Sequence, residues 1–239
     1  MTLQEYYDTM RQEAFHRLAR GEAQLDFQLQ TMQDDRRGLT LRAKLPAPIA
    51  ARVELMLADF QQIEPEQYYY PASDLHLTIL SIISCRSGFT LDTIDSAAYQ
   101  HAVRGSLQAS SSFTVTYTGV TASANAIILQ GTPADEGLAQ LREQVRSYFQ
   151  RTGLPQSMDE RYVLQTAHST VLRFRAPLRN PARLLEKIEA YQHHFFGSFE
   201  VEALELVYND WYHRAPNTLV LETYPLSKDR QHEAAVDLR

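Results

Sequence analysis

The stretch SDLHLTILSI, residues 73–82, is a short apolar run that carries His76 and Thr78 two positions apart. A run of this length, rich in Leu and Ile, is typical of a β-strand. Successive side chains of a strand point to opposite faces, so His76 and Thr78 lie on one face, about 7 Å apart. A titratable ring beside a hydroxyl on a rigid surface can hold an anion and move a proton. The stretch therefore indicates a functional site.

The same arrangement occurs a second time, in AHSTVL at residues 167–172, where Thr170 follows His168 by two positions. A histidine two residues before Ser or Thr arises easily by chance in a chain with eight histidines. The two copies share a longer pattern, apolar-His-x-Thr-Ile/Val-Leu, which chance explains less well. The alternative is a pair of ordinary core histidines with satisfied hydrogen bonds, and it suits one such residue better than a matched pair.

The elements that follow each histidine motif also match, although the residues themselves show little identity. Each motif strand precedes a helix, a strand, a turn and a strand. This order predicts an α+β, bilobal fold in which two antiparallel sheets with pseudo-twofold symmetry face each other across a cleft, with helices on the outer faces. The two histidines then meet in the cleft from opposite sides. The predicted ranges are helix 92–105 with strands 113–118 and 126–130, and helix 181–195 with strands 199–208 and 218–224.

Apolar residues recur at helical spacing from residue 3 to about residue 35. They predict an N-terminal helical extension, residues 1–38, that covers the domain behind it. Gly21 interrupts the run, and residues such as Leu25, Leu29 and Met32 continue the spacing. A helix that binds a partner protein is the alternative.

The bilobal domain is predicted to span residues 39–226, and a polar tail, residues 227–239, is expected to fray. Its remaining elements are a strand over 39–45, helices over 46–62 and 133–151, and the second motif strand over 164–174.

The composition is that of an ordinary globular protein, with 44% hydrophobic and 22% charged residues. A net charge of −6 argues against a protein that coats long nucleic acid, although a few arginines can still bind one phosphate. The single Cys85 excludes an internal disulfide and fits a reducing compartment. The sequence shows no signal peptide and no apolar run long enough to span a membrane. We therefore expect a cytoplasmic protein without membrane contact.

The motifs HLTIL and HSTVL resemble the paired H-x-[ST]-h motifs of the two-histidine (2H) phosphoesterase superfamily, which includes 2′-5′ RNA ligase-like proteins and 2′,3′-cyclic nucleotide phosphodiesterases. The likeness in element order covers about residues 39–226. The resemblance implies a bilobal fold and metal-independent action on a cyclic or otherwise activated 2′ or 3′ phosphate. It implies catalytic roles for His76, Thr78, His168 and Thr170, and it gives the N-terminal extension no role.

The chemistry of these residues supports the same conclusion. Opening a cyclic phosphodiester needs a base to deprotonate water and an acid to protonate the departing ribose oxygen, and histidine fills either role near neutral pH. Two threonine hydroxyls on opposite walls can donate to the charged phosphoryl oxygens. We assign His168 as the base and His76 as the acid, although the residues alone leave the reverse assignment open.

Further residues are candidates for substrate binding. Tyr70, Trp211 and Tyr212 can stack on a base, and Arg173 can pair with a phosphate. The alternative is that each aromatic residue packs in the core and that the arginine is solvated. No spacing of His, Cys, Asp or Glu indicates a metal site, and no glycine-rich phosphate loop is present, so we expect neither a metal nor a cofactor.

We therefore predict a metal-independent phosphodiesterase that hydrolyses a 2′,3′-cyclic phosphate or a 2′-5′ phosphodiester on a nucleotide or an RNA end. The acidic total favours short substrates, because long RNA requires an extended basic track. One alternative is a nuclease for cyclic oligonucleotide signals or 2′-5′ oligoadenylate. Another is a non-catalytic protein that binds nucleotides or RNA ends. The sequence leaves the oligomeric state open.

Overall fold

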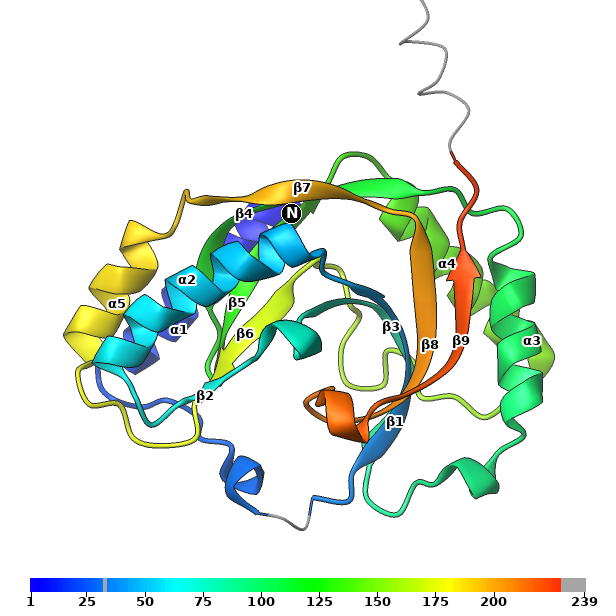
Figure 1. The fold of residues 1–239 in the computed structure, drawn as a ribbon, viewed down its shortest axis with the longest axis horizontal. Helices are drawn as coiled ribbons and strands as arrows, with labels where there is room; N and C mark the ends of the chain where they lie inside the picture. The colour runs from blue at the N-terminus through cyan, green and yellow to red at the C-terminus, as the bar shows by residue number, and fades with distance from the viewer. Residues whose placement is uncertain (32–33, 229–239) are drawn as a thin grey trace, which may run out of the picture.

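Two antiparallel sheets form the framework of the molecule (Figure 1). The computed structural model describes residues 1–31 and 34–228. In spatial order, the first sheet contains β3 (His76–Arg86), β1 (Arg37–Lys44), β8 (Ala203–Asp210) and β9 (Leu219–Pro225). The second contains β2 (Tyr68–Tyr69), β6 (Ser169–Arg173), β5 (Ala126–Pro133), β4 (Phe113–Ala122) and β7 (Phe195–Val201).

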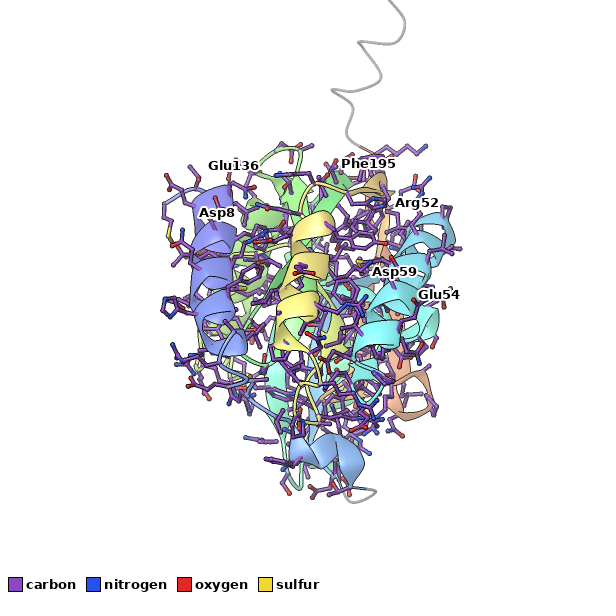
Figure 2. The ribbon with its side chains drawn as sticks, turned by 90° about the vertical axis from the view of Figure 1, so that its left-hand side faces the viewer. Asp8, Arg52, Glu54, Asp59, Glu136 and Phe195 are labelled. Atoms are coloured by element: carbon purple, nitrogen blue, oxygen red, sulfur yellow. The ribbon has the colours of Figure 1, made fainter. Side chains whose placement is uncertain are left out.

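The outer face of the second sheet is covered by α1 (Leu3–Leu18), α2 (Ala47–Ile63) and α5 (Pro181–Ala190). Figure 2 looks onto this face and shows the helices side by side, with α5 in the middle. Arg11 Nη2 lies 3.7 Å from Glu189 Oε1 between α1 and α5, and Lys187 Nζ lies 3.3 Å from Asp59 Oδ2 between α5 and α2. These ion pairs are exposed in part, so apolar burial supplies most of the stability of this layer.

The first sheet has its own helical cover. Helices α3 (Ser96–Ser106) and α4 (Gly137–Thr152) pack against each other, and they contact β9 and β3 respectively. Short 3-10 helices lie in the connections, at η1 (Phe27–Gln30), η2 (Ala72–Asp74), η3 (Leu91–Thr93) and η4 (Ala215–Asn217). The predicted α+β, bilobal arrangement of two antiparallel sheets with outer helices is confirmed.

Each sheet combines strands from both halves of the chain. The β4–β5 hairpin follows the first motif strand in sequence, but it pairs with β6, the second motif strand. The β8–β9 hairpin follows β6 and pairs with β1, beside β3. The two motif strands, β3 and β6, contact each other where the sheets meet. This exchange of hairpins brings the two histidine motifs together.

The predicted N-terminal helix is wrong beyond Leu18, where α1 ends. Gly21 has a φ of 71°, a left-handed conformation that suits glycine. The following backbone bonds to other elements instead of to itself: the Gln24 N–H donates to the Ala124 carbonyl and the Asp26 N–H to the Phe174 carbonyl, both over 2.8 Å. Leu29 lies in the short 3-10 helix η1, whereas Leu25 lies before it in an irregular segment, so their spacing does not reflect an α-helix. Met32 lies outside the described residues.

The predicted single strand over 199–208 is also wrong. The chain leaves the second sheet at Val201 and enters the first at Ala203, so this stretch belongs to β7 and β8. At the crossing, the carbonyl of Glu202 accepts the Leu226 N–H over 2.8 Å, which satisfies the backbone between the sheets. Two helix boundaries also differ from the predicted ones. Helix α5 ends at Ala190, before the predicted end at residue 195, and α3 begins at Ser96, after its N-cap Asp95, where the prediction began at residue 92.

The start of the predicted tail is ordered by the fold. Ser227 forms an isolated bridge with Ser111, and its carbonyl accepts the Ser112 N–H over 2.8 Å. The predicted tail residues 229–239 lie outside the described residues. Within the described ranges, no helix has both the length and the apolar character that crossing a bilayer requires.

Candidate active site

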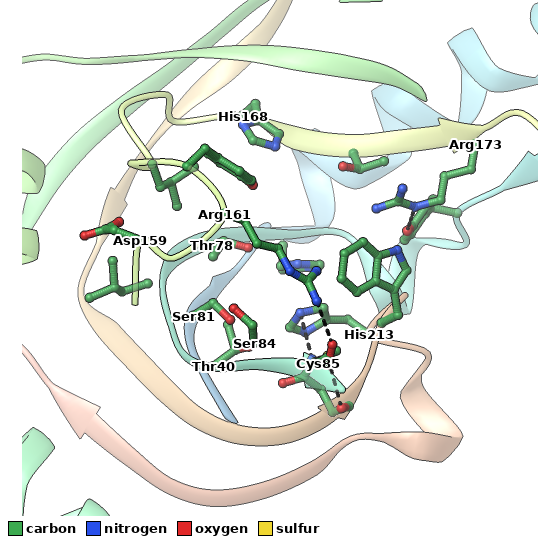
Figure 3. A pocket seen from close by; sticks show the side chains of 18 residues that line it. Thr40, Thr78, Ser81, Ser84, Cys85, Asp159, Arg161, His168, Arg173 and His213 are labelled. Carbon is green, nitrogen blue, oxygen red and sulfur yellow. Dashed lines mark hydrogen bonds between the residues drawn. The ribbon is translucent and has the colours of Figure 1, made fainter. Parts of the chain in front are cut away.

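An open cavity of about 170 Å³ lies between the two sheets, and Figure 3 shows its lining. An engineered cavity of about 150 Å³ is known to hold benzene, so this one has room for a phosphate with about one ring. A larger substrate would extend through the open mouth. The cavity brings together all of the sequence-predicted site residues except Tyr212, namely Tyr70, His76, Thr78, His168, Thr170, Arg173 and Trp211.

His76 is the first residue of β3 and is 9% exposed. Its Nδ1 lies 2.7 Å from the Asp74 carbonyl oxygen, which can only accept, so Nδ1 carries a proton and Nε2 is left for chemistry. Burial lowers the pKa of His76 to about 4, against a smaller rise from the Asp74 carbonyl. His76 is therefore neutral at neutral pH in the free protein.

His168 lies immediately before β6, one residue outside the strand that the sequence predicts to contain it. It is half-buried, and its Nδ1 lies 2.6 Å from the Thr166 hydroxyl. Burial lowers the pKa of His168 to about 4, and the positive charges of Arg142 and Arg173 contribute to that decrease. Each motif histidine is thus bound at Nδ1 by the residue two positions before it.

The two threonines keep the predicted spacing. Thr78 follows His76 by two positions in β3, Thr170 follows His168 in the same way, and both threonines line the cavity. Figure 3 shows Thr78 and His168 on facing walls of the cavity. The site therefore has an imidazole and a hydroxyl on each side of the space where a phosphoryl group would sit.

Arg142, on α4, ties the two motif segments together. Its Nη2 donates to the carbonyls of Thr78, over 3.0 Å, and Thr166, over 2.8 Å, while its Nε donates to the carbonyl of Ile79 over 2.8 Å. The side chain is almost completely buried, and it forms no ion pair within the described part of the chain. Burial lowers the pKa of Arg142 to about 10, so it stays charged at neutral pH. Sequence reasoning missed Arg142, because a helical arginine carries no signal of a contact with two distant strands.

Arg173 and Tyr70 form a second pair in the wall, where Arg173 Nε donates to the Tyr70 hydroxyl over 2.9 Å. Arg173 forms no ion pair with any described carboxylate. The positive charge of Arg173 lowers the pKa of both His76 and His168, so it lies within electrostatic reach of both. An anion in the cavity would balance this charge.

Trp211 lies at the centre of a cationic cluster. The guanidinium carbons of Arg36, Arg161 and Arg173 lie 4.9, 4.7 and 5.9 Å from its ring. Arg161 also lines the cavity and donates to the Cys85 carbonyl over 3.0 Å. No sequence pattern singles out Arg161, which lies in a loop outside both motifs.

Tyr212 does not line the cavity, contrary to its predicted role in substrate binding. Its side chain is fully buried, and its hydroxyl donates to Asp26 Oδ1 over 3.0 Å and accepts from Arg36 Nη2 over 2.9 Å. The Tyr212 ring therefore packs behind the residues that line the cavity and does not face the cavity itself. The neighbouring Trp211 occupies the position that sequence reasoning assigned to both residues.

The bilobal fold, which brings the histidine and the threonine of both motifs into one cavity, can be compared with solved structures. Among solved structures, TT0787 of Thermus thermophilus matches with a TM-score of 0.56 at 16% identity, over 81% of this chain and 100% of the other. LigT of E. coli, complexed with 3′-AMP, matches with a TM-score of 0.56 at 18% identity, over 81% and 99%. A structure described as a phosphoesterase matches with a TM-score of 0.52 at 19% identity, over 81% and 99%. The chain therefore has the 2H phosphoesterase fold.

No protein-family model matches the chain, and no curated protein matches it by sequence. The likeness to the solved structures thus rests on the fold. Within the described residues, no group of three or more His, Cys, Asp and Glu side chains is placed to hold a metal ion.

Proposed function

We propose that the protein is a phosphodiesterase that hydrolyses a 2′,3′-cyclic phosphate or a 2′-5′ phosphodiester on a nucleotide or an RNA end, by acid–base catalysis with His76 and His168. The observation that carries the proposal is the cavity that both histidine-threonine pairs line. The fold of the chain, shared with LigT and TT0787, supports a phosphoesterase. We expect the protein to act in the cytoplasm.

In the proposed reaction, neutral His168 accepts a proton from water as the water oxygen bonds to phosphorus. Protonated His76 donates its Nε2 proton to the ribose oxygen as the bond from phosphorus to that oxygen breaks. The hydroxyls of Thr78 and Thr170 donate to the non-bridging oxygens, on which charge develops. The Nδ1 contacts of the histidines, to the Asp74 carbonyl and the Thr166 hydroxyl, hold both rings in place.

The electrostatics of the cavity favour an anionic substrate. Arg161 and Arg173 line it and form no ion pair with a described carboxylate. The carboxylate of the lining, Asp159, is paired with Arg146 Nε over 2.5 Å. A bound phosphate would supply the missing negative charge, and it would favour the protonated form of one histidine. The negative charge of the substrate therefore favours the protonated form of His76 that the acid role requires.

The size of the cavity supports a nucleotide or a short RNA end as substrate. LigT has been crystallised with 3′-AMP, with ATP and with NADP+. For this chain we propose that the phosphate and its ribose occupy the cavity and that Trp211, half-buried in its wall, stacks on a base.

A substrate panel in the presence of EDTA tests the proposal. The panel contains 2′,3′-cyclic mononucleotides, 2′-5′ dinucleotides, 2′-5′ oligoadenylate and cyclic dinucleotides, and the proteins are the wild type, His76→Gln, His168→Gln and His193→Asn. His193 is exposed and lies outside the cavity lining, so its variant is the matched control.

We expect turnover of at least one cyclic or 2′-5′ substrate, a rate lower by roughly 10² to 10⁴ in each cavity variant, and no change in the control. Turnover restricted to cyclic dinucleotides or oligoadenylate would identify a signal nuclease instead. Tight binding without turnover would identify a binding protein. Full activity of a folded His76→Gln or His168→Gln protein would refute the mechanism.

A further inference from the structure

A third histidine, His213, lines the cavity beside His76 and has no part in the proposed hydrolysis. The two ring centroids are 4.0 Å apart, and the ring planes are inclined by 32°. His213 is 8% exposed. In Figure 3 it lies on the wall near Cys85, across the cavity from His168. A buried imidazole stacked on a catalytic one can change how the catalytic one holds a proton.

The turn that carries His213 is firmly held. His213 has a φ of 56°, in the left-handed region that residues with side chains seldom occupy. The buried Asp210 carboxylate fixes this turn, because its Oδ1 accepts the backbone N–H groups of Tyr212 and Arg214, each over 3.0 Å. Its Oδ2 accepts from Arg214 Nε over 2.6 Å. The surrounding structure therefore determines the unusual backbone and, with it, the position of the ring.

Asn209 determines which nitrogen of His213 carries the proton. Its Nδ2 donates to the Asp210 carbonyl over 2.8 Å and lies 3.0 Å from His213 Nε2. The carbonyl can only accept, which fixes the amide with its NH₂ group on this side. His213 Nε2 is then an acceptor, and the neutral ring carries its proton on Nδ1. A second proton, on Nε2, would place two hydrogen-bond donors, His213 Nε2 and Asn209 Nδ2, 3.0 Å apart with no acceptor between them.

The charged groups around the histidine pair make a doubly protonated pair unfavourable. The groups that face it from neighbouring elements are His168, Arg42 and Arg173, all neutral or positive. The nearby carboxylates are engaged elsewhere: Asp74 Oδ1 accepts from Ser73 Oγ and the Ala215 N–H, and Asp210 holds the turn. Burial raises the pKa of the Cys85 thiol to about 12, so it stays neutral. Arg42 is paired with Glu205 over 3.1 Å, and a proton on one ring of the histidine pair disfavours a second proton on the other.

We propose that His213 is a positioning residue for His76: Asn209 keeps its ring neutral, and this ring stacks on His76 and stabilises the protonated form of His76. A cation stacked on a neutral aromatic ring is attracted to it, and the attraction grows when water is excluded. The role of this contact in catalysis rests on the proposed function, whereas the effect on the protonation of His76 does not.

The test follows the imidazole signals of the full chain by NMR as a function of pH, with and without saturating inorganic phosphate. The variants are His213→Asn, which removes the ring and tolerates the left-handed backbone, and Asn209→Asp, which keeps the size of the side chain. His193→Asn is the control. The same proteins are assayed for kcat and KM with the best substrate of the panel.

We expect His213→Asn to lower the titration midpoint of His76 by about 0.4 to 1.5, and kcat by about 2- to 30-fold with little change in KM. In Asn209→Asp, a carboxylate accepts a proton from His213 Nε2, so His213 titrates at higher pH and its charge lowers the midpoint of His76. The control leaves both midpoints unchanged.

An unchanged His76 midpoint in folded His213→Asn overturns the proposal, as does a His213 ring that stays neutral in Asn209→Asp. If His213→Asn does not fold, the titration midpoints of His213 and His76 in the isosteric Asn209→Asp protein decide the proposal. The midpoints are measured without turnover. If the wild type hydrolyses no substrate, the proposed function fails while the inference about His76 and His213 is still decided by the NMR titrations.

Discussion

The Arg142 guanidinium donates a hydrogen bond to the carbonyl oxygen of Thr78 over 3.0 Å, and the same nitrogen reaches the carbonyl of Thr166 over 2.8 Å. One residue belongs to a motif strand of the first sheet, and the other is the partner of His168. A single buried side chain therefore bridges the two motif segments and fixes their separation.

Arg142→Lys should lower both activity and stability. A lysine ammonium cannot reach the carbonyls of Thr78, Ile79 and Thr166 together, and each buried carbonyl left without a donor costs about 1–3 kcal/mol. Urea unfolding and kcat measure the two effects. Arg151→Lys, at an exposed position of the same helix, is the control. Unchanged kcat in Arg142→Lys would show that the separation of the motifs does not depend on this contact.

The pH profiles of kcat/KM and kcat should differ. Burial lowers the pKa of His76 and of His168 to about 4 in the free protein, and hydrolysis needs one ring protonated and the other neutral. Above pH 4 the singly protonated fraction of the free protein falls about tenfold per pH unit, so kcat/KM falls as pH rises. The bound anion raises the pKa values of both histidines in the complex, so kcat begins to decrease at a higher pH than kcat/KM. Initial rates from about pH 4 to 8 measure both, and a kcat/KM that increases from about pH 5 to 7 would contradict the prediction.

The hydroxyls of Thr78 and Thr170 should act in the transition state. Thr78→Val and Thr170→Val remove one donor to the phosphoryl oxygens and keep the side-chain volume, so kcat should fall by roughly 10²- to 10³-fold. Thr→Ser at the same positions keeps the hydroxyl and should retain most of the activity. Valine variants with normal kcat would limit these residues to a structural role.

Trp211 should determine the affinity for the base. Trp211→Ala removes a stacking surface worth about 1–3 kcal/mol, which corresponds to a KM higher by about 5- to 150-fold for a nucleotide substrate. Tyr212→Phe is the matched control, because Tyr212 is fully buried behind the wall. It should lower stability by about 1 kcal/mol through the loss of its hydrogen bonds to Asp26 and Arg36, and leave KM unchanged. Equal KM values in Trp211→Ala and the wild type would exclude stacking.

The N-terminal extension should contribute to the stability of the whole domain. Tyr7 is 1% exposed, packs on Ala126 and Ile128, and donates to the Gly131 carbonyl over 3.2 Å. Tyr7→Ala should lower the free energy of unfolding by about 3–5 kcal/mol, and Tyr7→Phe by about 1 kcal/mol. Chemical denaturation measures both, with the exposed Gln12→Ala as control. An unchanged midpoint in Tyr7→Ala would mean that α1 is independent of the domain.

The sequence predicts the parts of this molecule that local patterns determine. His76 and Thr78 share a face of β3, because a spacing of two is a property of the strand itself. His168 lies immediately before β6 and Thr170 within it, and both residues still line the cavity. The cavity confirms that the pairs meet. The sequence could not predict Arg142, which acts through carbonyls distant in the chain. Nor could it predict the crossing at Glu202, because the apolar residues on either side alternate as in one continuous strand.

The position of His213 could not be predicted for a similar reason. It depends on a left-handed turn held by the buried Asp210, and neither the turn nor the burial follows from the local residue types. Trp211 and Tyr212 are adjacent aromatic residues in different environments: Trp211 lines the cavity, and Tyr212 is buried behind it. Tertiary packing decides between them.

The interleaved strand order has a consequence for how the molecule assembles. A polypeptide cut between the two repeats yields fragments that each lack a hairpin of their own sheet, since β4–β5 completes the layer of the second motif and β8–β9 that of the first. Neither fragment therefore contains a complete sheet. The cavity between the two imidazoles therefore forms only after the β8–β9 hairpin has paired with β1, late in the order of the chain.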